Sequence, residues 1–332
     1  MAAPDSLPTG KLSPELLSRL LADLPRSPDV VVGPGYGRDV AVLDAGLPGH
    51  YLVATADPIT FATDALAEYA VAVNLNDLAT AGAEPRWLLA TVLLPAGQAT
   101  EALAEAILGG LGEACARWGL ALVGGHTEVT AGLPHPLVCA QALGLVPRDG
   151  YLTAAGVQPG DEILLVGPCP VEGTALLARE AADRLAAAGM PPEEIAAAAA
   201  LLRDPGLCVL PYARLLRRWQ ARLHALHDPT EGGVATGLWE LALASGVELE
   251  VELGGVPVLP VALRCCAALG LDWRGLIASG CLLAAVAPGE AQRLRRLARE
   301  AGLPLTLLGV AHEGPPGAPG LPRFDQDEFT RL

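Results

Sequence analysis

The stretch VVVGPGYGRDVAVLD, residues 30–44, decides between two ways of building an α/β protein. Its glycines suggest a dinucleotide-binding loop, but such a loop must be followed by a helix. Residues 39–44 instead alternate as a β-strand does. The stretch therefore excludes a Rossmann domain and predicts a glycine-rich turn that brings Asp39 to the start of a strand. There Asp39 is either a turn-capping residue or a ligand.

Composition and charge restrict the class of protein. A chain of 332 residues is too long for one small core, and its 52% of hydrophobic residues can fill two domains. The net charge of −15 argues against a nucleic-acid partner, because a phosphate backbone requires a basic surface. Apolar runs such as residues 87–94 are shorter than the ~20 residues of a membrane helix, and residues 1–10 do not resemble a secretion signal. We expect a cytoplasmic protein without a membrane partner. Its seven cysteines form no CxxC pair, and an odd number without metal-ligand spacing suggests reduced, mostly buried thiols.

The order of the apolar patterns predicts two domains. The first half is β-rich with two helices, over residues 64–82 and 100–119. A Pro/Gly-rich joint at residues 147–161 leads to a second half in which strands alternate with helices, as in a layered α/β domain. The predicted units are an N-terminal domain at 1–148, a C-terminal domain at 149–313 and a loosely held Pro-rich tail at 314–332.

Polar residues interrupt two apolar segments of the first half. Asp57 follows a strand that we expect Pro58 to end. Asn74, Asn76 and Asp77 lie in an otherwise apolar helix, where Ala or Leu would be better helix formers. They form either a solvated face or a buried polar group that requires a partner such as a metal ion.

The segment LVGGHTEVT, residues 122–130, is the sharpest local signal in the first half. We expect its strand to end at Gly124 and Gly125, where the absence of side chains lets the backbone approach a ligand. His126, Thr127 and Glu128 would then cluster at the strand end. A lone HxE is also compatible with a structural histidine.

Two segments of the second half place polar groups at strand-to-helix turns. In HDPTEGG, residues 227–233, Asp228 ends a strand and Thr230 can cap the next helix. In residues 164–180, Gly173 lies at a helix N-terminus, which suits a phosphate. No GxxxxGK[ST] motif occurs, so a P-loop ATPase is excluded.

Five acidic residues lie at turns, at strand ends or at the helix interruption: Asp39, Asp57, Asp77, Glu128 and Asp228. If they gather, their repulsion requires cations, and oxygen ligands favour Mg²⁺, which also bridges phosphates. If they do not gather, they are scattered caps.

The motifs GPGYGRDVAVLD, TADP, NLNDLATAGAEP, VGGHTE and HDPTEGG, in this order, resemble the aminoimidazole ribonucleotide synthetase (PurM-like) superfamily. The resemblance extends from TGKL to ASGCLLAAVAP, nearly the whole chain. It implies an α+β N-terminal domain with a mixed sheet, a C-terminal α/β sandwich and a homodimer formed through the N-terminal domains. It also implies Mg-ATP bound in the cleft and phosphoryl transfer to a small-molecule substrate.

The resemblance also assigns roles to individual residues. Lys11 is the only lysine among 22 basic residues, and the resemblance places it in the segment that folds over the nucleotide phosphates. It implies catalytic roles for Lys11 and His126, and metal binding by the five acids named above. The residues expected around the nucleotide are Lys11, Gly37, Thr55, Asn74, Gly124, Gly125, Thr127 and Gly173.

The sequence departs from the family pattern at several points. His126 stands where some relatives have Asp, and Arg38 where several have a second acid. The similarity is greatest to the hydrogenase-maturation branch, but the sequence ends DEFTRL, without the cysteine that its dehydratase reaction needs. The segment SLPTGK lacks the cysteine or selenocysteine usual in selenophosphate synthetases. We expect ATP-dependent phosphoryl transfer to an unidentified small acceptor or, alternatively, a non-catalytic nucleotide-binding partner in a maturation or regulatory complex.

Overall fold

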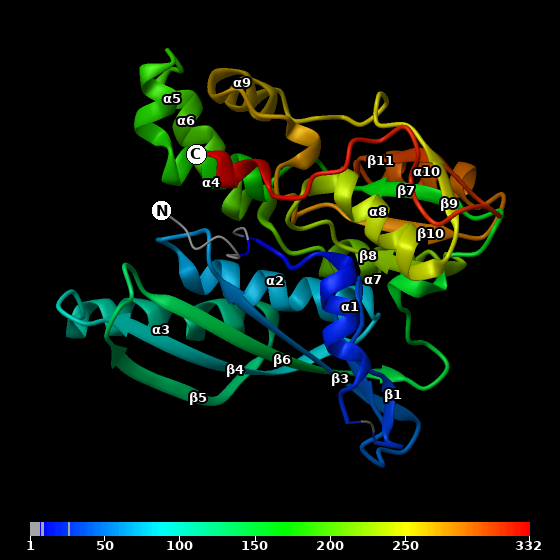
Figure 1. Cartoon of the computed structure of the whole chain (residues 1–332), viewed down its shortest axis with the longest axis horizontal. Helices are drawn as coiled ribbons and strands as arrows, with labels where there is room; N and C mark the ends of the chain where they lie inside the picture. Colours follow the sequence, from blue (N-terminus) through cyan, green and yellow to red (C-terminus); the bar gives the residue numbers. More distant parts are fainter. Residues whose placement is uncertain (1–6, 8–9, 26) are drawn as a thin grey trace.

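Two β-sheets, one from each half of the chain, organise the molecule (Figure 1). The structure is a computed structural model that describes residues 7, 10–25 and 27–332. The remaining residues, which include most of the segment compared above with a secretion signal, lie outside this description.

The first sheet has the strand order β1-β2-β3-β6-β4-β5, and its only parallel pair is β4 with β5. The glycine-rich stretch connects one strand to the next, so the prediction of a turn rather than a dinucleotide loop is confirmed. The strands are β1 (Val30–Val32), β2 (Ala41–Leu43), β3 (His50–Ile59), β4 (Glu84–Pro95), β5 (Ala121–Thr130) and β6 (Leu137–Pro147).

The prediction that Pro58 ends its strand is wrong. β3 continues to Ile59, and Pro58 lies opposite Cys139 of β6. The pairing of β2 with β3 stops at Ala54, so this part of β3 is free on its other side. A proline is tolerated there because no ladder hydrogen bond is lost.

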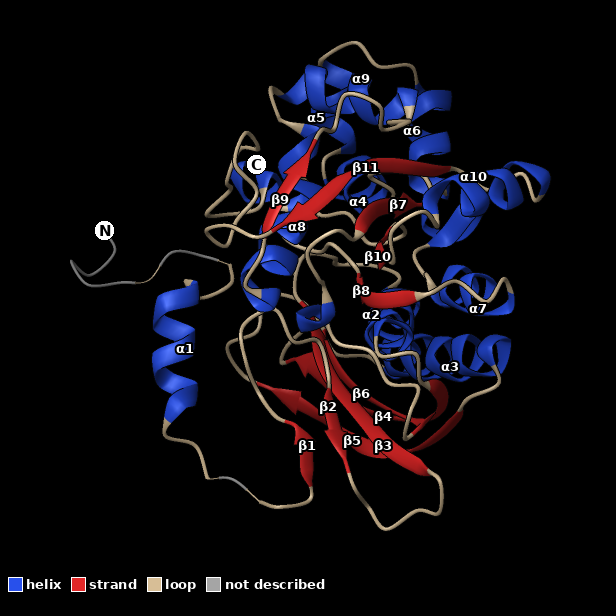
Figure 2. Ribbon diagram, turned by 90° about the vertical axis from the view of Figure 1, so that its right-hand side faces the viewer, coloured by secondary structure: helices blue, strands red, loops and turns tan. Residues whose placement is uncertain are grey.

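Helices α2 (Leu66–Thr80) and α3 (Glu101–Trp118) cover one face of the first sheet (Figure 1). Helix α2 lies between that sheet and the second half, and 13 of its 15 residues are buried. Burial on all sides explains why it is apolar around its whole circumference. Helix α1 (Pro14–Ala22) lies at the side of the molecule, begins at the capping hydroxyl of Ser13, and buries none of its own residues (Figure 2).

The second sheet has the order β8-β10-β7-β11-β9 and is antiparallel throughout. Strands and helices alternate along the chain as predicted. The strands are β7 (Glu162–Val166), β8 (Leu223–His227), β9 (Glu248–Val251), β10 (Leu282–Val286) and β11 (Leu305–His312). The helices are α4 (Glu172–Glu180), α5 (Ala182–Ala187), α6 (Pro192–Ala200), α7 (Leu210–Arg218), α8 (Gly233–Ser245), α9 (Pro260–Leu269) and α10 (Ala291–Glu300), with short η turns at Ala154–Gly156, Leu202–Gly206, Trp273–Gly275 and Glu328–Arg331.

The alternation of side chains in β7 separates the two layers of the second half. Ile163 and Leu165 pack with α8, whereas Leu164 and Val166 pack with α7 and α10. This arrangement, a sheet with helices on both faces beside a mixed sheet, is the fold class expected from the sequence.

Asn76 joins the two halves. Its side-chain amide donates to the carbonyl of Leu207 at 3.0 Å and its oxygen accepts from the N–H of Val209 at 2.8 Å. Both partners precede α7. One of the polar interruptions of α2 is therefore a structural link between the two halves.

The prediction of a loosely held tail is wrong. Gly317 pairs with Val247 and Leu249 at the edge strand β9, and Asp327 and Glu328 are buried. Phe329 lies against Phe61 of the first half, with ring centroids 5.5 Å apart. A Pro-rich segment lacks regular secondary structure, but it can still be fixed by backbone pairing and by buried side chains.

The stretch Pro192–Arg218 has the length and composition of a membrane-crossing helix, and 28% of its most apolar window is buried. The structure divides it into α6, an irregular turn and α7, and α7 packs in the core of the second half.

Candidate functional site

A cavity of about 960 Å³ lies between the two halves and is lined by residues from both. The first half contributes the glycine-rich turn, β3 and α2. The second half contributes the turn after β8, the start of α4 and the loop before β10. Lys11, which precedes α1, lies at the same cavity.

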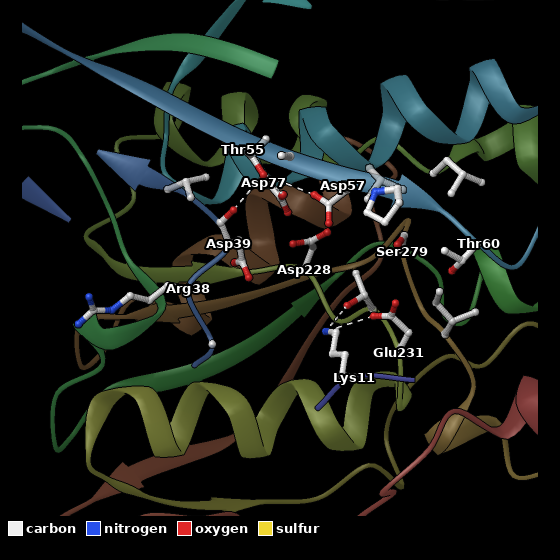
Figure 3. Close-up of a pocket in the computed structure, with 18 of the residues that line it drawn as sticks. Lys11, Arg38, Asp39, Thr55, Asp57, Thr60, Asp77, Asp228, Glu231 and Ser279 are labelled. Carbon is white, nitrogen blue, oxygen red and sulfur yellow. Dashed lines mark hydrogen bonds and ion pairs between the residues drawn. The ribbon is translucent and has the colours of Figure 1, made fainter. Parts of the chain in front are cut away.

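Four of the five candidate acids converge in this cavity (Figure 3). Asp39 follows the glycine-rich turn, Asp57 lies in β3, Asp77 in α2, and Asp228 directly after β8. The hydroxyl of Thr55 bonds to the carboxylate of Asp77 and to the carbonyl of Asp39, the latter at 3.0 Å. The polar interruption of α2 is thus not a solvated face, and these four acids are not scattered caps.

Crowding and burial shift the ionisation of these carboxyl groups. Burial, followed by the charges of Asp57 and Asp228, raises the pKa of Asp77 well above its ordinary value. Burial and then Asp39 do the same to the pKa of Asp228. The Oδ2 atom of Asp228 has no hydrogen-bond partner within the described chain. A site made of oxygen donors, with one buried oxygen unpartnered, fits Mg²⁺.

His227 and Glu240 extend the acidic cluster, and the sequence analysis missed both. His227 is buried, with Nδ1 3.1 Å from Asp39 and Nε2 3.0 Å from Glu240. Burial would lower its pKa, but the two carboxylates outweigh burial and raise it well above the usual value. Two carboxylates therefore contact His227, one at each ring nitrogen.

Lys11 lies on the opposite side of Glu240. Its Nζ is 2.9 Å from the hydroxyl of Thr230, 3.2 Å from Glu231 and 3.6 Å from Glu240. Desolvation would lower the pKa of Lys11, but Glu240 and Glu231 hold it well above the ordinary value. Burial alone would raise the pKa of Glu240, whereas the charge of Lys11 and the bond from His227 lower it to about 2.

The segment 124–128 does not reach the cavity of its own chain. The strand does not end at Gly124 and Gly125, as expected, but continues to Thr130. Pairing with β4 along its whole length keeps it extended. His126 and Glu128 are exposed and contact each other at 3.0 Å, and Thr127 is exposed between them.

Of the other residues expected to surround the nucleotide, some line the cavity and others lie outside it. Gly37 and Thr55 line the cavity, and Gly37 has a positive φ of 68° that favours glycine. Asn74 is buried outside the cavity lining and donates to Ala70. Arg38 lines the cavity rim, but its side chain points away from the acids and donates to Gly33 (Figure 3).

The expectation of a phosphate at Gly173 is not compatible with the structure. The N–H groups of Glu172 and Gly173 already donate to Ser279 and Ile277, at 3.1 and 2.9 Å. A Cβ at position 173 would lie 2.3 Å from the side chain of Leu276. The glycine is needed because α4 packs directly on the loop 276–279.

Three polar residues of the cavity lie in or near the contact between α4 and the loop 276–279, and the sequence analysis singled out none of them. Tyr69, Glu172 and Ser279 line the cavity and are almost completely buried. Burial raises the pKa of Glu172 to about 8. A glutamate in the first turn of a helix looks like an ordinary end residue in the sequence, and Tyr69 like a core aromatic, so neither gave a signal.

Comparison with known proteins agrees with this architecture. Residues 37–146 match the family model described as AIR synthase related protein, N-terminal domain, and residues 158–319 match the corresponding C-terminal domain. The chain belongs to the AIR synthase related protein family. It is 32% identical over 256 residues to the carbamoyl dehydratase HypE of Cupriavidus necator, covering 75% of this chain and 67% of that protein.

One further relative has a different name, and two solved structures share the fold. The selenide, water dikinase of Nitratidesulfovibrio vulgaris, strain Miyazaki F, is 32% identical over 258 residues, which cover 75% of this chain and 69% of that protein. A structure of HypE in complex with ATP superposes with a TM-score of 0.66 at 24% identity, covering 89% of this chain and 86% of that one. The structure of AaThiL complexed with AMPPCP and TMP gives 0.67 at 19%, covering 92% and 90%. At these identities the superpositions show the shared fold.

Replacing Glu172 by glutamine should change how stability depends on pH. The folded-state pKa of about 8 lies above the usual 4.5, so the native protein loses stability as the pH rises through this interval. Glutamine has the same shape without the charge, so the stability of E172Q relative to the parent should increase from about pH 5 to pH 8. Urea unfolding at several pH values measures the difference, and a difference independent of pH would contradict the assignment.

Proposed function

We propose that the protein binds Mg-ATP in the cavity between its two halves and transfers a phosphoryl group to a small acceptor. The observation that carries the proposal is the convergence of Asp39, Asp57, Asp77 and Asp228 beside Lys11. The names of the relatives support it, because they include a dikinase, an ATP complex of HypE and an AMPPCP complex of AaThiL. The cytoplasm is the expected compartment.

The aspartates would hold Mg²⁺, and the ion, when bound, neutralises phosphate charge. Thr55 fixes the carboxylate of Asp77, and His227 fixes that of Asp39. Lys11 presents a compact, mobile positive charge, which suits a phosphoryl group in transfer. Thr230, Glu231 and Glu240 orient its ammonium group.

A non-catalytic nucleotide-binding role is the alternative. Arg38 stands where several relatives have an acid, so this position supplies no carboxylate to the cavity, and His126 lies outside the cavity. A solved HypE–HypF complex shows that a structural neighbour assembles with another protein. This alternative predicts that ATP binds and is never turned over.

A homodimer is part of the proposal. Helices cover one face of the first sheet (Figure 1). The half-buried side chains Leu89, Leu93, Leu143 and Leu145 alternate with core residues along β4 and β6, so they lie on the opposite face. At the sheet edge, β5 is exposed along nearly its whole length. A second copy on this face would bury these side chains. It would also give the predicted residues 124–128 access to a cavity, that of the partner.

Asp77→Asn should weaken Mg-dependent ATP binding by about tenfold or more, because one charged oxygen ligand becomes a neutral amide. Isothermal titration with ATP at fixed Mg²⁺ measures the change. Asp149→Asn, at an exposed position of the chain, is the matched control and should bind as the parent does. Absence of ATP binding by the folded parent protein at millimolar ligand overturns the proposed function.

Lys11→Ala should reduce ATP turnover by about 100-fold while changing the ATP dissociation constant by less than about threefold, because its charge acts on the transferring group. Steady-state ATP consumption and titration give the two values separately. Arg19→Ala, on the exposed side of α1, controls for loss of a nearby positive charge. Unchanged turnover in Lys11→Ala would mean that composition alone explains the single lysine.

Leu93→Glu should convert the dimer to a monomer, because a charge would be buried in the apolar contact. Light scattering after size-exclusion chromatography measures the mass. Leu108→Glu, on the helix-covered side of the sheet and already 40% exposed, should leave the mass unchanged. A monomeric parent protein would contradict the proposed assembly.

A further inference from the structure

The cavity contains a second polar group that the Mg-ATP proposal does not use. Tyr69 of α2, Glu172 at the start of α4 and Ser279 before β10 all line it. Their exposed fractions are 1%, 4% and 0%. They are distinct from the four aspartates and from Lys11, and we call them the Tyr69–Glu172–Ser279 group.

Each residue of this group has an unsatisfied polar atom. The hydroxyl of Tyr69, Oε2 of Glu172 and Oγ of Ser279 make no hydrogen bond of ordinary geometry with the residues that the structure describes, although Ser279 lies near enough to the Glu172 carboxyl to oppose the rise in its pKa. Leaving one such atom buried and unpaired costs about 1–3 kcal/mol, so native proteins satisfy nearly all of them. Three such atoms on residues that line the same cavity suggest that a ligand supplies the missing partners.

The group is held rigidly. The backbone bonds from Glu172 to Ser279 and from Gly173 to Ile277 fix the start of α4 against the loop before β10. The absence of a side chain at Gly173 allows this close contact. Burial and then the charge of Glu172 raise the pKa of Tyr69. A rigid set of polar atoms can select a ligand group by geometry.

The chemistry of the three atoms indicates which ligand group fits. All three oxygens can accept a hydrogen bond, and one belongs to a carboxyl group. Within the described part of the chain, Glu172 forms no ion pair with an arginine or lysine, and the nearby Arg179 is paired with Asp64. A primary ammonium group has three N–H donors for these three acceptors, and its positive charge would favour the ionised form of Glu172, whose pKa burial raises to about 8 in the absence of a ligand.

We propose that the Tyr69–Glu172–Ser279 group is the binding subsite for the acceptor, and that the acceptor carries a primary amino group. The proposal rests on the proposed phosphoryl-transfer function, because it identifies the second substrate of the same cavity. The amino group anchors the acceptor at this wall and takes no part in the transfer.

The test uses ethylammonium as the probe and the full chain without ATP, in a phosphate buffer free of amines. Acetamide and acetate have similar size but carry a neutral or negative group. A ligand of three heavy atoms can reach a dissociation constant of about 1 mM. We expect ethylammonium to bind in that range and at least about tenfold more tightly than either analogue, because only it makes a charged hydrogen bond to Glu172.

Variants assign the binding to the group. Glu172→Gln should weaken ethylammonium binding about tenfold, and Tyr69→Phe and Ser279→Ala should each weaken it about threefold to tenfold, because each loses one acceptor. Glu180→Gln, at the other end of α4, is the matched control and should bind normally. If Glu172→Gln does not fold, Tyr69→Phe and Ser279→Ala still test the subsite.

The subsite is overturned if ethylammonium does not bind to the folded parent, or if acetamide or acetate binds more tightly than ethylammonium. It is also overturned if folded Glu172→Gln binds ethylammonium as the parent does. Where Glu172→Gln does not fold, unchanged binding in both Tyr69→Phe and Ser279→Ala has the same meaning. ATP titration of the same samples separates the two proposals. Ethylammonium binding that depends on this group, in protein that binds no ATP, supports the subsite and overturns the phosphoryl-transfer function. ATP binding without ethylammonium binding supports the phosphoryl-transfer function and overturns the subsite.

Discussion

Repulsion between carboxylates is the constraint on which the rest of the structure depends. The two halves of the chain bring Asp39, Asp57, Asp77 and Asp228 into one partly buried cavity, where charges interact far more strongly than in water. Two basic side chains, His227 and Lys11, contact Glu240. Oδ2 of Asp228 still has no hydrogen-bond partner among the residues that the structure describes. A divalent cation bound among the four aspartates, as we propose, would offset this repulsion.

Local patterns in the sequence were sufficient for the fold and for part of the site. Periodicity located the strands and helices, and the strand after the glycine-rich turn excluded the wrong fold class. Asp77 was found because a carboxylate inside an apolar helix requires an explanation. The same argument applies to Glu240 in the apolar helix α8, so this residue was within reach of the sequence. His227 and Glu172 had no comparable signal, because a histidine in a strand and a glutamate in a first helical turn are ordinary.

The remaining errors concern contacts between distant parts of the chain. Gly124 and Gly125 looked like the end of a strand, yet pairing with β4 extends that strand to Thr130 and carries His126 away from the cavity. Gly173 looked like a phosphate-binding turn, but the loop at Leu276, some hundred residues later, already occupies its N–H and its open side. The bond between Lys11 and Thr230 spans 219 residues. No local pattern specifies such pairs.

The short turn after β8 is held from two directions. Lys11 bonds to Thr230 from one side, and the carboxylate of Asp327 accepts the N–H of Gly232 at 2.8 Å from the other. These two contacts join positions at nearly opposite ends of the sequence through three consecutive residues. The position of this turn, and of Asp228 directly before it, therefore depends on segments that lie far from it on both sides along the chain.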